Sequence, residues 1–236
     1  HALLGENGAG KSTLMNIMTG VIPFDSGDIY FNGIRYDEPT IEGMEKAGIA
    51  FVHQELDVVN DLTVADNIFL NREIKKGLLL DKKEMVRRTQ QLFNDLGVNI
   101  NPNEMVADLK TAEKQLLLIC RALYVDAKLL ILDEPTTALS NDEIDHLFSI
   151  ITNLKKQGKS FIFISHKMPE IFKISDRYTV FRNGEMISSG YIKDTNPQLV
   201  TSDMVGAKYV DEDVYVSRPL GDTILELKHV SGVGFE

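Results

Sequence analysis

Cysteine is almost absent from this sequence and tryptophan is missing altogether: the 236 residues include one Cys, at position 120, and no Trp. One thiol cannot form a disulfide within the chain, so a disulfide-stabilised fold is excluded. This scarcity favours a reducing compartment, most simply the cytosol. Cys120 lies in an apolar segment that is predicted to be helical, and we therefore expect a buried thiol rather than a reactive one.

Long apolar runs and blocks of basic residues are missing too. No stretch approaches the roughly 18 apolar residues that cross a bilayer, and no signal peptide is visible. The chain has 35 acidic and 25 basic residues, for a net charge of −10, and the two signs are interspersed. A nucleic-acid-binding protein would present a basic face to the phosphate backbone, so we expect no nucleic-acid partner.

One segment carries a specific chemical signal. Residues 5–12, GENGAGKS, match the phosphate-loop pattern G-x-x-x-x-G-K-[ST] without a gap, between a predicted strand at 2–4 and a predicted helix from Lys11 to about Thr19. Glycines let successive main-chain N–H groups converge on phosphate oxygens, and a lysine can reach the β- and γ-phosphates. The predicted nucleotide-binding residues are Gly5, Glu6, Asn7, Gly8, Ala9, Gly10, Lys11, Ser12 and Thr13.

Polar side chains also follow the ends of three further predicted strands, at 48–52, 128–132 and 160–164. The residues that come after these strands are Gln54, Asp133, Glu134 and His166. In an open α/β sheet, ligands bind beyond the carboxyl ends of the strands, so we expect these side chains to meet the phosphate loop.

Each of these groups has a predicted role. Ser12, Gln54 and Asp133 offer oxygen atoms to Mg²⁺. Glu134 can polarise an attacking water molecule as a general base, and His166 can hydrogen-bond the γ-phosphate and hold the water and Glu134 in register. The predicted catalytic residues are therefore Gln54, Glu134 and His166, and the predicted cofactors are ATP and Mg²⁺.

Strands and helices alternate along most of the chain, with one interruption. Asn-Gly pairs at 32–33 and 183–184 predict two antiparallel hairpins. Between residues 56 and 126 helical patterns replace the strands. Three helices are expected there, beginning near Thr63, Asp81 and Thr111. This order predicts an α/β P-loop NTPase (RecA-like) fold: a mainly parallel sheet with a helical subdomain insertion and antiparallel hairpins.

The motifs resemble those of ABC transporter ATPases, in the order of that family and as far as about residue 206. The resemblance assigns Walker A to 5–12, the Q-loop to Gln54, Walker B to 129–133, the D-loop to 138–140 and the switch histidine to His166. Residues 52–55 (VHQE), 62–68 (LTVADNI) and 133–140 are most similar to the group of monosaccharide importers that includes the galactose, ribose and xylose systems.

This resemblance implies an ATPase that energises import of a monosaccharide, peripheral to the membrane at its cytoplasmic face. The implied partners are membrane permease subunits, a second ATP-binding domain in the same polypeptide and, indirectly, a periplasmic or surface sugar-binding protein. The chain opens at His1 within a predicted strand, and we expect it to be a fragment. The expected domains are an ATP-binding core at 1–55 and 127–206 whose N-terminal strands are missing, a helical signature subdomain at 56–126, a linker at 207–222 and the first strand of a truncated second ATP-binding domain at 223–236.

One motif departs from the family pattern. The signature, usually LSGGQ, should fall at Leu109, Lys110, Thr111, Ala112 and Glu113. Lys110 replaces the serine that the resemblance would place against the γ-phosphate in the opposing domain, and Thr111 and Ala112 replace two glycines. We therefore expect the site at 5–12 to hydrolyse ATP and the mirror site to hydrolyse poorly.

Two other functions remain open at this point. A soluble ABC-type ATPase of translation or DNA repair would need a basic surface or a long coiled-coil insertion, and the sequence has neither. A regulatory nucleotide sensor would bind without hydrolysing, and the presence of Glu134 and His166 disfavours it. We expect a transport ATPase.

Overall fold

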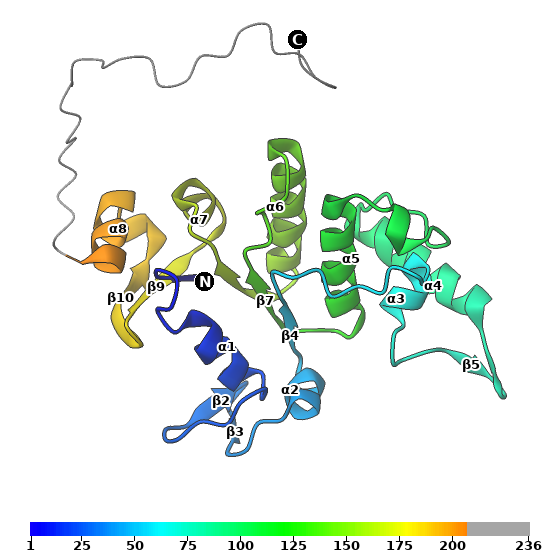
Figure 1. The fold of residues 1–236 in the computed structure, drawn as a ribbon, viewed down its shortest axis with the longest axis horizontal. Helices are drawn as coiled ribbons and strands as arrows, with labels where there is room; N and C mark the ends of the chain where they lie inside the picture. Colours follow the sequence, from blue (N-terminus) through cyan, green and yellow to red (C-terminus); the bar gives the residue numbers. More distant parts are fainter. Residues whose placement is uncertain (207–236) are drawn as a thin grey trace, which may run out of the picture.

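A six-stranded sheet, ordered β10-β9-β1-β8-β7-β4, forms the centre of the computed structural model, which describes residues 1–206 (Figure 1). Its strands are β1 (Ala2–Leu4), β4 (Ile49–Val52), β7 (Leu129–Asp133), β8 (Ser160–Ile164), β9 (Arg177–Arg182) and β10 (Glu185–Tyr191). All neighbouring strands are parallel except β9 and β10, which form an antiparallel hairpin. The predicted mainly parallel α/β sheet is confirmed. The expected linker at 207–222 and strand at 223–236 lie outside the described residues.

Helices cover both faces of this sheet because successive strand residues point to opposite sides. Leu3 and Ile131 face a cluster that includes Met15 of α1 (Lys11–Met18) and Met44 of α2 (Ile41–Ala47). On the other face, Leu4 packs with residues of α7 and α8. The helices on that side are α6 (Asn141–Lys156), α7 (Met168–Ile174) and α8 (Pro197–Val205), and a 3₁₀ turn, η2 (Ile192–Asp194), precedes α8.

The segment between β4 and β7 is helical, as expected, and packs against the end of the sheet that β4 forms (Figure 1). Its elements are α3 (Val64–Ile68), the short hairpin β5 (Lys75–Lys76) and β6 (Leu79–Leu80), α4 (Lys82–Leu96), the 3₁₀ turn η1 (Val106–Asp108) and α5 (Thr111–Tyr124). Thr63 caps α3 by accepting a hydrogen bond from the Asp66 N–H at 3.1 Å. Cys120 is buried within α5, and burial raises the pKa of its thiol to about 12, which agrees with a core thiol.

Both predicted Asn-Gly hairpins are present. Asn32 (φ 51°) and Gly33 (φ 77°) connect β2 (Ile29–Phe31) to β3 (Ile34–Tyr36). Asn183 and Gly184 connect β9 to β10, also with positive φ, as a two-residue hairpin turn requires.

No helix within residues 1–206 combines the length and the apolar character needed to cross a membrane.

Candidate nucleotide-binding site

The phosphate loop connects β1 to α1 in a conformation that needs its glycines. Gly5, Gly8 and Gly10 have φ values of 149°, 82° and 100°. A Cβ atom on Gly5 would lie 2.3 Å from the main-chain oxygen of Phe181, so a side chain is excluded there. The N–H of Gly184, in the β9–β10 turn, donates to the carbonyl of Ala9 at 3.0 Å. The conformation of the loop is thus fixed by its glycines and by a hydrogen bond from the neighbouring hairpin.

The main-chain N–H groups at the start of α1 are suited to an anion. Among the described residues, the N–H groups of Lys11 and Ser12 donate to no protein acceptor. Such unpaired groups, together with the positive end of a helix, favour a bound phosphate. Ser12 and Thr13 lie exposed in this first turn. The residues present therefore fit the phosphate groups of a nucleotide.

Lys11 is held inside the loop. Its ammonium group donates to the carbonyl oxygens of Gly5 at 2.8 Å and Glu6 at 3.0 Å. Burial lowers the pKa of this ammonium group, while the negative charges of Asp133 and Glu134 oppose the shift. The lysine therefore lies in the electric field of both carboxylates, which come from the end of a different strand.

Glu134 takes a strained main-chain conformation directly after β7. Its φ is 44°, uncommon for a residue with a side chain, and its N–H donates to the carbonyl of Ile164 at 2.9 Å. The Glu134 carboxylate lies 2.9 Å from Nδ1 of His166 and accepts a hydrogen bond from the Thr137 hydroxyl at 3.2 Å. Two residues predicted to cooperate are thus paired across the ends of β7 and β8.

Asp133 ends β7 and is half-buried. Burial and the adjacent Glu134 raise the pKa of its carboxyl group, while Lys11 and His53 oppose that shift. Within residues 1–206, no group of three His, Cys, Asp or Glu side chains could hold a metal ion. A magnesium ion here would therefore depend on mixed oxygen donors such as the Ser12 hydroxyl, the Asp133 carboxylate and a phosphate. That donor set fits Mg²⁺, which binds few protein carboxylates.

A cavity of about 670 Å³ brings together part of the phosphate loop and the three predicted catalytic residues, whereas Ser12 and Asp133 are not among its lining residues. It is lined by Gly5, Glu6, Asn7, Lys11, Gln54, Glu134, Ser165, His166, Met204 and Val205. The sequence prediction missed three of these. Ser165 follows strand β8 immediately, so the strand-end rule could have found it, whereas nothing in the sequence of α8 indicates that Met204 and Val205 reach the cavity.

A polar cluster joins residues close in sequence to Glu134 and His166, and the sequence analysis did not foresee it. The hydroxyl of Thr136 donates to the Glu170 carboxylate at 2.6 Å, and the side chain of Glu170 is 10% exposed. The ammonium group of Lys167 lies 3.2 Å from the same carboxylate and donates to the Thr136 carbonyl at 3.1 Å. These contacts tie the segment after β7 to the segment after β8.

The signature segment, residues 109–113, lies at the N-terminus of α5, and none of its residues lines the cavity at the phosphate loop. Leu109 and Ala112 are buried, and Thr111 is exposed. Lys110 occupies the N-cap position, and its N–H donates to the Glu113 carboxylate at 2.8 Å. A lysine side chain has no acceptor, so it cannot cap the helix as a serine would.

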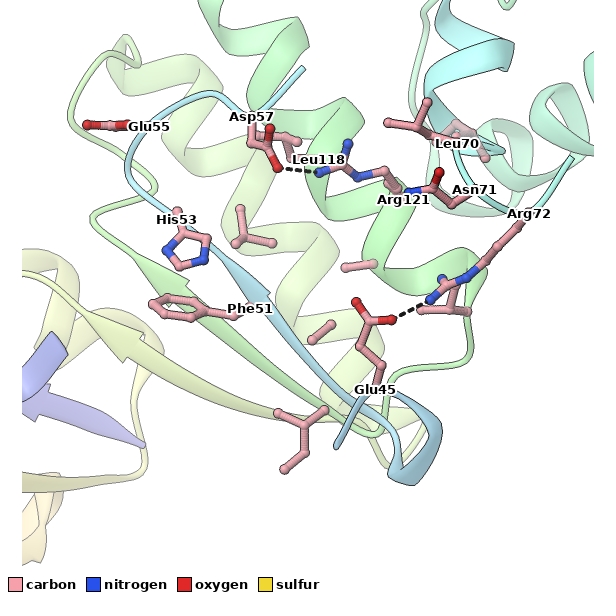
Figure 2. A pocket seen from close by; sticks show the side chains of 16 residues that line it. Glu45, Phe51, His53, Glu55, Asp57, Leu70, Asn71, Arg72, Leu118 and Arg121 are labelled. Carbon is pink, nitrogen blue, oxygen red and sulfur yellow. Dashed lines mark hydrogen bonds and ion pairs between the residues drawn. The ribbon is translucent and has the colours of Figure 1, made fainter. Parts of the chain in front are cut away.

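A second cavity, of about 290 Å³, opens between the sheet edge and the helical segment (Figure 2). Two ion pairs border it: Arg72 with Glu45 at 2.7 Å and Arg121 with Asp57 at 3.6 Å. Figure 2 shows both arginines reaching toward their carboxylates across the groove. We call this cavity the α2–α5 groove.

Comparison with known proteins identifies the family. The ABC transporter family matches residues 1–137, more than half of the sequence, and the chain therefore belongs to this family. The ATP-binding cassette MJ1267 of an ABC transporter, in its ADP conformation, superimposes with a TM-score of 0.74 at 26% identity, over 87% of each chain. The fold is accordingly the P-loop NTPase fold of these nucleotide-binding domains, as the sequence predicted.

The chain is also similar to curated proteins of longer sequence. The ribose import ATP-binding protein RbsA of Clostridium perfringens is 43% identical over 232 residues, which are 98% of this chain and 46% of the relative. The galactose/methyl galactoside import ATP-binding protein MglA of the same species is 40% identical over 231 residues, 98% of this chain and 45% of the relative. The chain thus spans somewhat less than half the length of these relatives.

Proposed function

We propose that this chain is an ATP-hydrolysing domain that energises import of a monosaccharide across the cell membrane. The observation that carries the proposal is the contact of 2.9 Å between Glu134 and His166, both of which line the same cavity as Lys11. A domain that only bound nucleotide would not need a paired carboxylate and imidazole at this position. The names of the relatives, ribose and galactose import ATP-binding proteins, support the transport role.

In the proposed reaction, the main-chain N–H groups of the phosphate loop and the Lys11 ammonium group hold the phosphates of ATP. A water oxygen attacks the γ-phosphorus, and ADP leaves as the bond to the β–γ bridging oxygen breaks. The Glu134 carboxylate takes the proton of the attacking water, and His166, hydrogen-bonded to Glu134, keeps the carboxylate in line with the γ-phosphate. Ser12, Asp133 and Gln54 would hold Mg²⁺, which offsets charge on the phosphate oxygens when bound.

We further propose that the active unit contains two such domains. The core at 1–55 and 127–206 would supply the phosphate loop, and the helical subdomain at 56–126 would present residues 109–113 to the partner domain's nucleotide. The relatives are about twice as long as this chain, which supports a second ATP-binding domain in the same polypeptide. Since Lys110 occupies the place of the signature serine, the site that this segment completes would hydrolyse poorly.

The α2–α5 groove is the proposed docking place of the membrane permease. It combines apolar walls with charged rims, and its lining includes residues of β4 and of the segment after it, close in sequence to Gln54. A permease helix seated there could therefore move Gln54 and the nucleotide site together. We therefore propose that the chain is a peripheral subunit at the cytoplasmic face of the membrane, with a sugar-binding protein outside the membrane as an indirect partner.

The test is an ATPase assay on the complete gene product, alone and reconstituted with its permease subunits and sugar-binding protein in vesicles. We expect Mg²⁺-dependent hydrolysis that rises when the sugar-loaded binding protein is present. Binding of ATP without hydrolysis in either setting would indicate a nucleotide sensor instead. Hydrolysis that does not respond to the permease would indicate an ATPase unconnected to transport.

A further inference from the structure

The hairpin β5–β6 exposes more apolar surface than a free surface turn normally does. Leu78, Leu79 and Leu80 follow one another at its tip, and they are 102%, 76% and 46% exposed. Gly77 has a φ of 66°, which allows the two-residue turn between Lys76 and Leu79. Isolated exposed leucines are common, but three in succession on a projecting ribbon indicate a surface that contacts something else.

The charge around these leucines is opposite to that of the chain as a whole. Residues 71–90 contain seven Lys and Arg against three Asp and Glu, although the whole chain has a net charge of −10. Lys75 and Lys76 are exposed, and neither forms an ion pair with any residue of the described range 1–206. One of the three acids, Glu84, is bound by two arginines at 2.7 and 2.8 Å. The hairpin therefore presents apolar and positively charged groups together.

Both faces of the hairpin carry this combination. Lys75 lies opposite Leu80, and Lys76 lies opposite Leu79, in an antiparallel pair. Residues directly opposite each other share a face and successive residues alternate, so one face carries Lys75 with Leu80 and the other carries Lys76 with Leu79. A protein that docked from the side would cover one face and leave the other leucine in water. A medium that surrounds the tip would cover both.

We propose that this hairpin is a membrane-surface anchor. Leu78, Leu79 and Leu80 would enter the boundary between headgroups and acyl chains, and Lys75 and Lys76 would lie against the phosphates of anionic lipids. The hairpin begins three residues after Arg72, which borders the α2–α5 groove, and projects away from the sheet (Figure 1). The inference rests on the proposed function in one respect: a permease in that groove brings the hairpin beside a bilayer.

The experiment is sedimentation of the complete gene product, purified without permease or nucleotide, with vesicles of phosphatidylcholine alone or mixed with phosphatidylglycerol. We expect binding to the anionic vesicles and little to the neutral ones. Lys75→Gln with Lys76→Gln should weaken that binding roughly 25-fold, about fivefold for each lysine. Leu78→Asp with Leu79→Asp should abolish it, while thermal unfolding and ATP binding stay as in the parent protein because both side chains are exposed.

The matched control is Leu199→Asp. Leu199 is a comparably exposed leucine, and it lies on α8, outside the helical segment that carries the hairpin. This variant should bind anionic vesicles like the parent protein. The proposal is overturned by absence of binding to any vesicle, by equal loss in the Leu199 variant, or by binding that requires permease in the bilayer. These outcomes are separate from the proposed ATPase activity, because neither permease nor nucleotide is present.

Discussion

Two segments that the sequence analysis matched to family motifs lie at helix N-termini, and their geometry differs. Before α1, the phosphate loop uses glycines with positive φ, and the N–H groups of Lys11 and Ser12 have no acceptor among the described residues. Before α5, Lys110 has an ordinary extended conformation, and its N–H is already bonded to the Glu113 carboxylate. A helix N-terminus is therefore not enough for a phosphate site: free N–H groups and close main-chain approach are also needed. The first segment has both, whereas the second has no glycine and the N–H of its N-cap residue is already bonded to a side chain.

The largest difference in ATP turnover between the two segments should appear when the lysine of the phosphate loop is removed. Lys11→Ala in the complete gene product should lower ATP turnover by about 100-fold or more, because the positive charge of Lys11 stabilises the transferring phosphate. Turnover and ATP affinity, the latter by calorimetry, are the measurements. Lys110→Ala is the matched control at the other helix and should keep most of the turnover. Comparable losses in the two variants would contradict the distinction between the segments.

Replacement of Asp133, a carboxylate whose charge acts on Lys11, should lower activity without lowering stability. Asp133→Asn should reduce Mg²⁺-dependent turnover by roughly 10²-fold, since it removes a charged ligand. It should not lower the melting temperature at pH 7. The pKa of Asp133 is raised by burial, so its charged form costs folding free energy, a cost that disappears as pH falls through that raised pKa. A variant that melts well below the parent at pH 7 would show that the charge stabilises the fold instead.

The polar cluster at Thr136 and Glu170 should make a measurable contribution to stability. Thr136→Val leaves the buried Glu170 carboxylate without its hydroxyl donor at 2.6 Å, which should cost about 1–3 kcal/mol of unfolding free energy. Urea unfolding measures this cost. Thr111→Val, at the exposed first residue of α5, should change it by less than about 0.5 kcal/mol. Loss of turnover beyond the loss of stability in the first variant would indicate that Thr136 also positions the Glu134–His166 pair.

The smallest change in turnover should follow from restoring the usual signature residues, a test that adds a function to the second segment instead of removing one from the first. Lys110→Ser with Thr111→Gly and Ala112→Gly should raise turnover of the complete gene product, at most to about double, because a second site begins to hydrolyse. The two glycines should lower the melting temperature slightly, since glycine costs about 1 kcal/mol in a helix. Unchanged or reduced turnover in a folded variant would mean that the departure at Lys110 is not what limits the second site.

Local patterns predicted most of the fold and many of the residues at the site. The Asn-Gly turns, the strand-end polar residues and the glycine loop depend on neighbours in sequence, and the structure contains all three. Helices α2, α7 and α8 were not predicted, because they have only seven to nine residues and short helices carry little periodic signal. The second residue of α7 is Pro169, and α8 begins at Pro197, a start signal that could have found both.

The features that sequence reasoning missed depend on contacts between distant segments. The positive φ of Glu134 arises where its N–H bonds to Ile164, thirty residues away. The Thr136–Glu170 contact likewise joins two strand-end segments that only the sheet order brings together. The sequence predicted that Glu134 and His166 act together. Their distance of 2.9 Å could be known only from the structure.

The central claim is that the cavity beside residues 5–12 is the hydrolytic site and that Glu134 is its base. The most direct test is the ATP turnover of the Glu134→Gln variant in the complete gene product, measured together with ATP binding. The glutamine keeps the size of the side chain but cannot accept a proton, so turnover should fall by about 10²–10⁴-fold. ATP affinity should stay within a few-fold of the parent protein. Unchanged turnover in this variant would contradict the account.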